Sequence, residues 1–181
     1  MIELSEQELL DLLKNPKSHE QGFRLLVQQY QERLYWHIRR LVGTHEDAND
    51  VLQNVFIKVH KNIQQFSGNA KLYTWLYRIA SNEAFTFIKQ QKRHAVADLE
   101  ASFASALQAD PYFDGDAAQV KLQIALRQLP DKQQIVFVMR YFEALPYEEI
   151  SKILATSVGA LKASYHHAAK KIEAYLRTMA E

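Results

Sequence analysis

Two pairs of adjacent residues have side chains that could do metal or acid–base chemistry. His166 and His167 offer two imidazoles, and Glu148 and Glu149 offer two carboxylates. Neighbouring positions on a helix diverge by about 100°, so the two rings cannot easily share one ion, and no cysteine or suitably spaced histidine accompanies them. The glutamates fall in the first turn of a predicted helix, where the helix dipole favours solvated acidic residues. The sequence therefore predicts no catalytic residue, no metal site and no cofactor.

The segment from Thr44 to Phe66 is a predicted helix with an unusual outward face. Its apolar residues at helical spacing, such as Val51 and Val55, form a core side, whereas the opposite side is polar around Ile57. Two interpretations remain open, a single exposed isoleucine or a protein-binding patch with an apolar centre. The candidate binding residues are Asp50, Gln53, Asn54 and Ile57.

A predicted helix with basic and aromatic residues follows the glycine-containing loop 67–70. Tyr73 and Tyr77 lie at the edge of its polar side, and basic residues interleaved with rings suit single-stranded nucleic acid. The alternative is a solvated basic face beside ordinary core aromatics. The candidate nucleic-acid contacts on its polar side are Arg78, Ser81, Asn82 and Lys89.

Residues 151–171 have the pattern of a helix-turn-helix, with a break at 155–157 between a short and a longer helix. Such a unit places its second helix in the DNA major groove. Small residues on the outward side permit close approach to DNA, and lysines offer phosphate contacts, but no arginine strengthens them. The candidate residues are Ser157, Gly159, Ala160, Lys162, Ala163, His166, His167, Lys170 and Lys171.

Helices must position all of these residues, because apolar side chains recur at three- and four-residue spacing throughout. Prolines, glycines and polar breaks delimit the predicted helices 4–14, 19–42, 46–65, 71–92, 119–128, 131–142, 147–154 and 158–178. We therefore expect an all-α protein of two small, separately packed helical domains. These are residues 1–93 and 119–181, joined by an acidic flexible linker, 94–118, with helix around 97–108. The alternative for 94–118 is a surface helix inside a single domain.

Charge and composition narrow the class of protein. The chain has 181 residues, no cysteine and a net charge of +1, which divides into +3 for residues 1–93, −5 for 94–118 and +3 for 119–181. Two mildly basic blocks therefore flank an acidic strip. The acidic N-terminus does not resemble a signal peptide, and no apolar run approaches the roughly 20 residues of a membrane span. We expect no membrane insertion and a cytoplasmic location.

Three stretches in this order, 46–66, 73–93 and 126–172, resemble an extracytoplasmic-function (ECF) sigma factor of the sigma-70 family. The resemblance implies that Asp50, Gln53 and Asn54 contact the clamp of RNA polymerase, although relatives usually have glutamate where this chain has Asn54. It implies contact of Arg78 and its neighbours with the inner, −10, promoter element. It also implies capture of an unpaired promoter base by the loop 67–70, which adds the candidate residues Ser67, Gly68, Asn69 and Ala70.

The same resemblance implies that the outward side of 158–172 reads the upstream, −35, promoter element. Relatives often have arginine where this chain has Ser164, His167 and Ala169, so a weaker grip on DNA is expected. The implied partners are core RNA polymerase and promoter DNA, and an anti-sigma factor is a further partner known for the family. The implied function is transcription initiation at specific promoters, without catalytic activity of the chain itself.

Two other functions remain open from the sequence. A helix-turn-helix regulator that is not a sigma factor would use only the C-terminal unit and would leave the face around Ile57 unexplained. A helical protein–protein adaptor would account for the low basic content of 158–172. Co-elution with core polymerase distinguishes the sigma factor from both.

Overall fold

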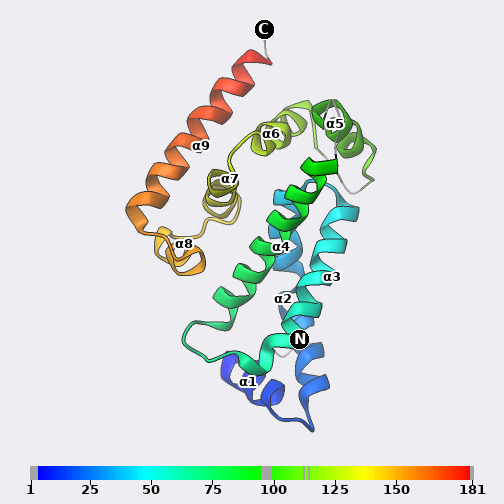
Figure 1. Ribbon diagram of the computed structural model, residues 1–181, viewed down its shortest axis with the longest axis vertical. Helices are drawn as coiled ribbons and strands as arrows, with labels where there is room; N and C mark the ends of the chain where they lie inside the picture. Colours follow the sequence, from blue (N-terminus) through cyan, green and yellow to red (C-terminus); the bar gives the residue numbers. More distant parts are fainter. Residues whose placement is uncertain (1–3, 95–98, 112, 114, 180–181) are drawn as a thin grey trace.

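The protein, described from a computed structural model at residues 4–94, 99–111, 113 and 115–179, is helical with no strand among those residues, which confirms the predicted fold class. The N-terminal part contains α1 (Glu6–Lys14), α2 (His19–Val42), α3 (His45–Asn62), a 3-10 turn η1 (Ile63–Gln65) and α4 (Leu72–His94). The remainder contains α5 (Leu99–Ala109), α6 (Ala117–Arg127), α7 (Asp131–Phe137), the π-helical turn η2 (Val138–Phe142), α8 (Tyr147–Leu154) and α9 (Val158–Thr178) (Figure 1). None of the described helices combines the length and apolar character needed to cross a membrane.

Side-chain caps fix the starts of the helices that carry the candidate site. Thr44 Oγ1 accepts a hydrogen bond from the backbone N–H of Asp47 at 3.2 Å, at the start of α3. Ser157 Oγ accepts one from the N–H of Ala160 at 3.3 Å, at the start of α9. Each cap satisfies a backbone donor that has no partner within its helix. The caps therefore fix the residues at which α3 and α9, the two helices predicted to carry binding faces, begin.

The segment predicted as a flexible linker is packed where the structure describes it. It contains α5, whose Phe103 and Leu107 are buried together with Val120 of α6. Gly43 ends α2 with φ +100°, and a Cβ at this position would lie 2.3 Å from the Phe103 ring. Glycine is therefore required there both by the backbone conformation and by the close approach of α5. Part of the predicted linker lies outside the described residues.

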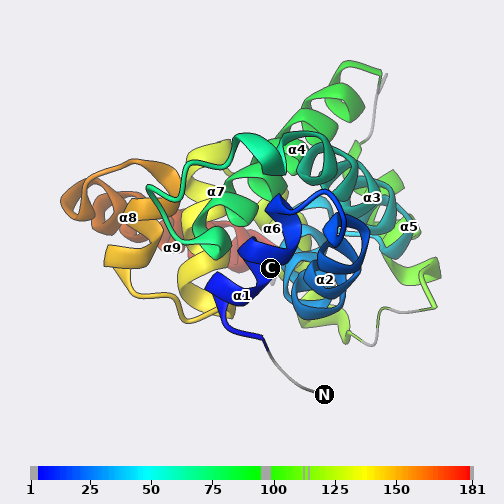
Figure 2. The same cartoon turned by 90° about the horizontal axis from the view of Figure 1, so that it is seen from below.

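The two helical domains pack against each other. Within the N-terminal domain α2 contacts α1, α3 and α4, and within the C-terminal domain α9 contacts α6, α7 and α8. Between domains, α4 contacts α8, and α2 contacts η2 and α6, so that α4 lies between α3 and the C-terminal helices (Figures 1 and 2). One cluster of buried residues includes Leu76 of α4 and Ile150 and Ile153 of α8. This corrects the expectation of separately packed blocks, and we call the contact the domain interface.

Candidate nucleic-acid and polymerase interface

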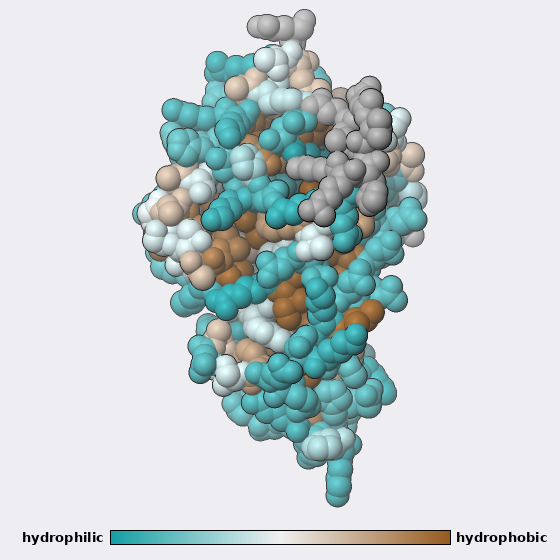
Figure 3. Space-filling model, viewed as in Figure 1, coloured by the Kyte–Doolittle hydropathy of each residue, from teal (hydrophilic) through white to brown (hydrophobic). Residues whose placement is uncertain are grey.

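The outward side of α3 is exposed, as predicted. Burial of its opposite side, which includes Val51, Val55 and Val59, orients the helix. Ile57 is 45% exposed and is one of few large hydrophobic side chains exposed among the described residues. Figure 3 shows one face of the molecule, which is mainly hydrophilic and has hydrophobic side chains visible mainly between polar ones. The four candidate residues, which we call the α3 face, are Asp50, Gln53, Asn54 and Ile57, and all are exposed.

An apolar groove adjoins the α3 face. Phe23 and Val27 of α2 form one wall, and Phe56 and Ile57 of α3 form the other, with Gln53, His60 and Lys61 completing the lining. The Phe23 and Phe56 rings meet edge to face, with centroids 6.4 Å apart. An apolar centre with polar flanks is the composition of a protein-binding surface, one of the two interpretations that the sequence leaves open for this helix.

The loop predicted to capture a promoter base is accessible. Ser67, Gly68 and Asn69 are exposed and Ala70 is half-buried. Gly68 has φ +75°, and no atom lies within 4 Å of the position a Cβ would take. The loop is tied down at its end, where the backbone N–H of Leu72 donates to Glu6 Oε1 at 2.9 Å. A fixed, open loop of this kind leaves room for a ligand, and base capture by it stays a prediction.

Arg78 of α4, predicted to face DNA, is engaged by the C-terminal domain instead. Its Nε donates to the carbonyl of Ile153 at 2.9 Å, and its Nη2 donates to that of Lys152 at 2.6 Å. These are carbonyls of the last turn of α8, where partial negative charge favours a cation. Lys89 pairs with Asp131 of α7 at 3.6 Å but its side chain stays 64% exposed, and Arg78 and Asn82 are exposed as well. In this conformation the Arg78 guanidinium is occupied by the α8 carbonyls, although the side chain is not covered.

Ser81, also predicted to face DNA, is buried and belongs to a hydrogen-bonded chain across the domain interface. Its hydroxyl donates to the carbonyl of Tyr77 at 2.6 Å, which leaves its oxygen to accept from His37 Nε2 at 3.0 Å. His37 Nδ1 lies 2.7 Å from Glu143 Oε1. The His37 side chain is fully buried and that of Glu143 is 8% exposed, so the two form a buried hydrogen-bonded pair between the domains.

The C-terminal domain in turn caps α2. Arg127 Nη1 donates to the carbonyl of Val42 at 2.8 Å, and Gln134 Nε2 donates to that of Leu41 at 3.1 Å. Burial lowers the pKa of Arg127, whose guanidinium carbon lies 4.2 Å from the centroid of the Phe103 ring. Together with Arg78 at α8, these contacts mean that each domain satisfies helix-end carbonyls of the other.

A buried ion pair joins α2 to the predicted linker. Arg39 Nη2 lies 2.8 Å from Asp110 Oδ2, and both side chains are buried. The same carboxylate oxygen accepts from the backbone N–H of His45 at 2.6 Å. Sequence reasoning singled out none of the residues in these contacts, namely His37, Arg39, Asp110, Arg127, Gln134 and Glu143. Arg39 and Asp110 are 71 residues apart in the sequence, and His37 and Glu143 are 106 residues apart. No local pattern indicates either pair.

The outward side of α9 is open over its whole predicted length. Leu161, Ala168 and Ile172 are buried and orient the helix, and the Tyr165 ring stacks on Phe137 with centroids 5.5 Å apart. The His166 and His167 rings are 6.0 Å apart and exposed. The candidate residues, which we call the α9 face, are Ser157, Gly159, Ala160, Lys162, Ala163, His166, His167, Lys170 and Lys171, and all are exposed.

Comparison with known proteins identifies both halves of the chain. Residues 26–94 match the model of Sigma-70 region 2, and residues 119–172 match that of Sigma-70, region 4. The ECF RNA polymerase sigma factor SigW of Bacillus subtilis is 31% identical over 175 residues, covering 90% of this chain and 93% of that protein.

Solved structures show the same fold. CnrH, in complex with the cytosolic domain of CnrY, has a TM-score of 0.67 at 19% identity, covering 96% of this chain and 97% of that one. The sigma factor RpoE of Bartonella quintana, in complex with the anti-sigma factor NepR, has a TM-score of 0.64 at 18% identity, covering 87% and 98%. With region 2 and region 4 both present in order, the chain belongs to the sigma-70 family and is an ECF-type sigma factor.

Proposed function

We propose that this protein binds core RNA polymerase through the α3 face and directs it to specific promoters in the cytoplasm. The observation that carries the proposal is the exposed Ile57 at the centre of a polar face on a well-packed helix. In this proposal residues 1–93 bind polymerase and open the −10 element, 94–118 connect the domains, and 119–181 read the −35 element. No catalytic role is assigned to any residue.

The two rival functions each leave one face without a purpose. A regulator that used only α8 and α9 would not need the α3 face, and an adaptor without DNA binding would not need an α9 face with three exposed lysines. Co-purification of the full-length protein with core polymerase tests the proposal directly. A chain that binds promoter duplex alone but never core polymerase would support the regulator.

The domain interface gives the proposed function a resting state. It engages Arg78, which in this proposal contacts the −10 element, and leaves the α3 face exposed. We infer that the free protein can meet core polymerase in this closed form and that the domains separate before promoter DNA is opened. An anti-sigma partner is part of the proposal, supported by the likeness of the fold to RpoE bound to NepR.

Asn82 provides a test of promoter opening that does not disturb the domain interface, because its side chain is exposed. Loss of one hydrogen bond, worth about 1 kcal/mol, should lower promoter opening by about fivefold in Asn82→Ala. Permanganate reactivity of promoter thymines in the polymerase complex measures this, at unchanged core binding. Gln90→Ala, another exposed polar residue of α4, serves as the control. Equal reactivity in both variants would mean that the side chain of Asn82 is merely solvated.

The lysines of the α9 face predict a shallow dependence of promoter binding on salt. Each phosphate contact contributes about −0.9 to the slope of log affinity against log salt. Lys170→Ala should therefore flatten the slope of the holoenzyme by about one unit and weaken binding to all upstream sequences alike. Lys132→Ala, which removes an exposed lysine from α7, should leave the slope unchanged. A change in sequence preference with Lys170→Ala, at constant slope, would assign this lysine to the bases.

A further inference from the structure

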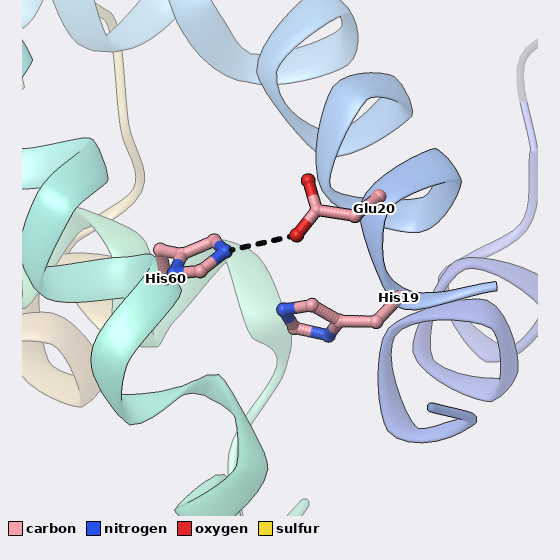
Figure 4. Close-up of side chains that lie close together, drawn as sticks. All are labelled: His19, Glu20 and His60. Carbon is pink, nitrogen blue, oxygen red and sulfur yellow. Dashed lines mark ion pairs between the residues drawn. The ribbon is translucent and has the colours of Figure 1, made fainter. Parts of the chain in front are cut away.

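Two histidines and a glutamate converge on the surface at the junction of α2 and α3, outside the proposed DNA-binding faces. His19 and Glu20 are the first two residues of α2, and His60 lies in the last turn of α3. One ligand atom from each lies within 4.8 Å of those from the other two. Figure 4 shows the two rings and the carboxylate pointing toward one another from two different helices.

The surroundings of His19 favour the tautomer that a metal ligand requires. Its Nδ1 lies 2.7 Å from the backbone carbonyl of Leu13, an acceptor, and 3.1 Å from the Gln64 side-chain nitrogen, a donor; the shorter contact, to the carbonyl, favours a hydrogen on Nδ1. Gln64 Nε2 donates to the same carbonyl at 2.7 Å and holds it in place. The unprotonated Nε2 of His19 is then the nitrogen that faces His60 (Figure 4). A histidine whose second nitrogen donates to a carbonyl is the usual arrangement of a histidine that binds metal.

The ring of His60 is held at the same place by aromatic contacts. Its centroid is 5.1 Å from that of His19 and 4.8 Å from that of Phe23, both in edge-to-face geometry. His60 Nε2 is 3.6 Å from Glu20 Oε1, too long for a good hydrogen bond. Ligands of tetrahedral zinc, bound at about 2.0–2.2 Å, are separated by about 3.3–3.5 Å. The carboxylate and this nitrogen therefore already lie at nearly the separation that an ion between them would require.

We propose that His19, Glu20 and His60 form a site for a divalent first-row transition metal, with Zn²⁺ as the ion tested. The donor set is two neutral imidazoles and one carboxylate, which suits zinc and leaves a fourth position for water. The remaining adjustment is small, because Glu20 is 82% exposed and can rotate toward the rings. A bound ion would join the start of α2 to the end of α3, at the end of the groove that His60 lines.

A simple surface ion pair between Glu20 and protonated His60 is the alternative, and zinc titration separates the two. Calorimetric titration of the untagged full-length protein with Zn²⁺ should show one site per chain. Zn²⁺ should also raise the melting temperature, since a ligand of the native state stabilises it. Affinity should fall as pH falls, because protonated histidine cannot bind metal. Cobalt substitution should give the intense visible absorption of a tetrahedral site.

Variants locate the ion. Glu20→Gln and His60→Ala should each weaken zinc binding by at least about tenfold. Substitution of residues that only support a metal ligand already weakens binding by about 10- to 100-fold, so loss of a ligand should have no smaller effect. Glu46→Gln, an exposed glutamate in the first turn of α3, is the matched control and should bind zinc normally. Because Glu20 is so exposed, its variant keeps the fold and the test stays valid even where His60→Ala loses stability. Zinc binding unchanged in both variants, or no binding in the parent protein, overturns the site. No polymerase is present, so the result is independent of the proposed function.

Discussion

Ile57→Glu should abolish co-elution of the protein with core RNA polymerase while leaving its helicity and melting temperature nearly unchanged. Substitutions at exposed positions change stability by only about 0.5 kcal/mol, and Ile57 is 45% exposed. In a complex the same side chain would be buried. Since 45% of the side chain remains to be buried, the variant would lose about 1 kcal/mol of apolar burial, and it would place an unpaired carboxylate at the centre of the interface, which costs several kcal/mol more. Together these effects exceed a hundredfold in affinity.

Two controls separate loss of the apolar contact from the added charge. Ile57→Leu keeps the apolar volume and should co-elute normally. Gln28→Glu adds the same charge at an exposed position of α2, outside the α3 face, and should also co-elute. If Ile57→Glu co-elutes like the parent protein, the α3 face does not bind polymerase.

Much of the fold could be predicted because its signals are local. The predicted helices 19–42, 147–154 and 158–178 coincide with α2, α8 and α9. Gly43 ends the first of these, and Ser157 caps the last, and each acts through residues close by in the chain. Apolar spacing placed the buried side of α9 correctly for the same reason, since one helix turn suffices to define it.

The arrangement between helices could not be predicted in this way. A helical wheel places Ser81 and Arg78 on one side of α4 but does not show that α8 binds Arg78 or that His37 of α2 binds Ser81. The pairing of His37 with Glu143 spans 106 residues, and it lies beside a π-helical turn, Val138–Phe142, inside what periodicity describes as one helix. The convergence of His19 and His60 is likewise a product of tertiary packing. Long-range polar contacts carry no signature in local spacing.

The His37–Glu143 pair leads to the second large prediction, Glu143→Ala. The substitution leaves the fully buried His37 without its carboxylate partner. Leaving a buried hydrogen-bonding group without its partner costs about 1–3 kcal/mol, and this cost falls on the closed state because the pair spans the two domains. The population should therefore shift by about five- to a hundredfold toward separated domains.

The absence of cysteine from the chain makes this shift measurable. Lys71→Cys, just before α4, and Lys152→Cys, on α8, provide two labelling positions on elements at opposite sides of the domain interface. Energy transfer between the labels should be high in the parent background and should fall in Glu143→Ala. Glu148→Ala, an exposed carboxylate at the start of α8, should leave it high. Equal transfer in all three proteins would show that this pair does not hold the domains together.

The functional consequence of Glu143→Ala distinguishes a resting state from a purely structural contact. The α3 face is exposed in the closed form, so affinity for core polymerase should not change. Arg78 is held by carbonyls of α8 in the closed form, so open promoter complexes should form faster once the interface is weakened. A variant that formed open complexes no faster than the parent protein, despite separated domains, would show that closure does not limit initiation. Faster opening at constant core affinity is the result expected if separation of α8 from α4 precedes contact with the −10 element.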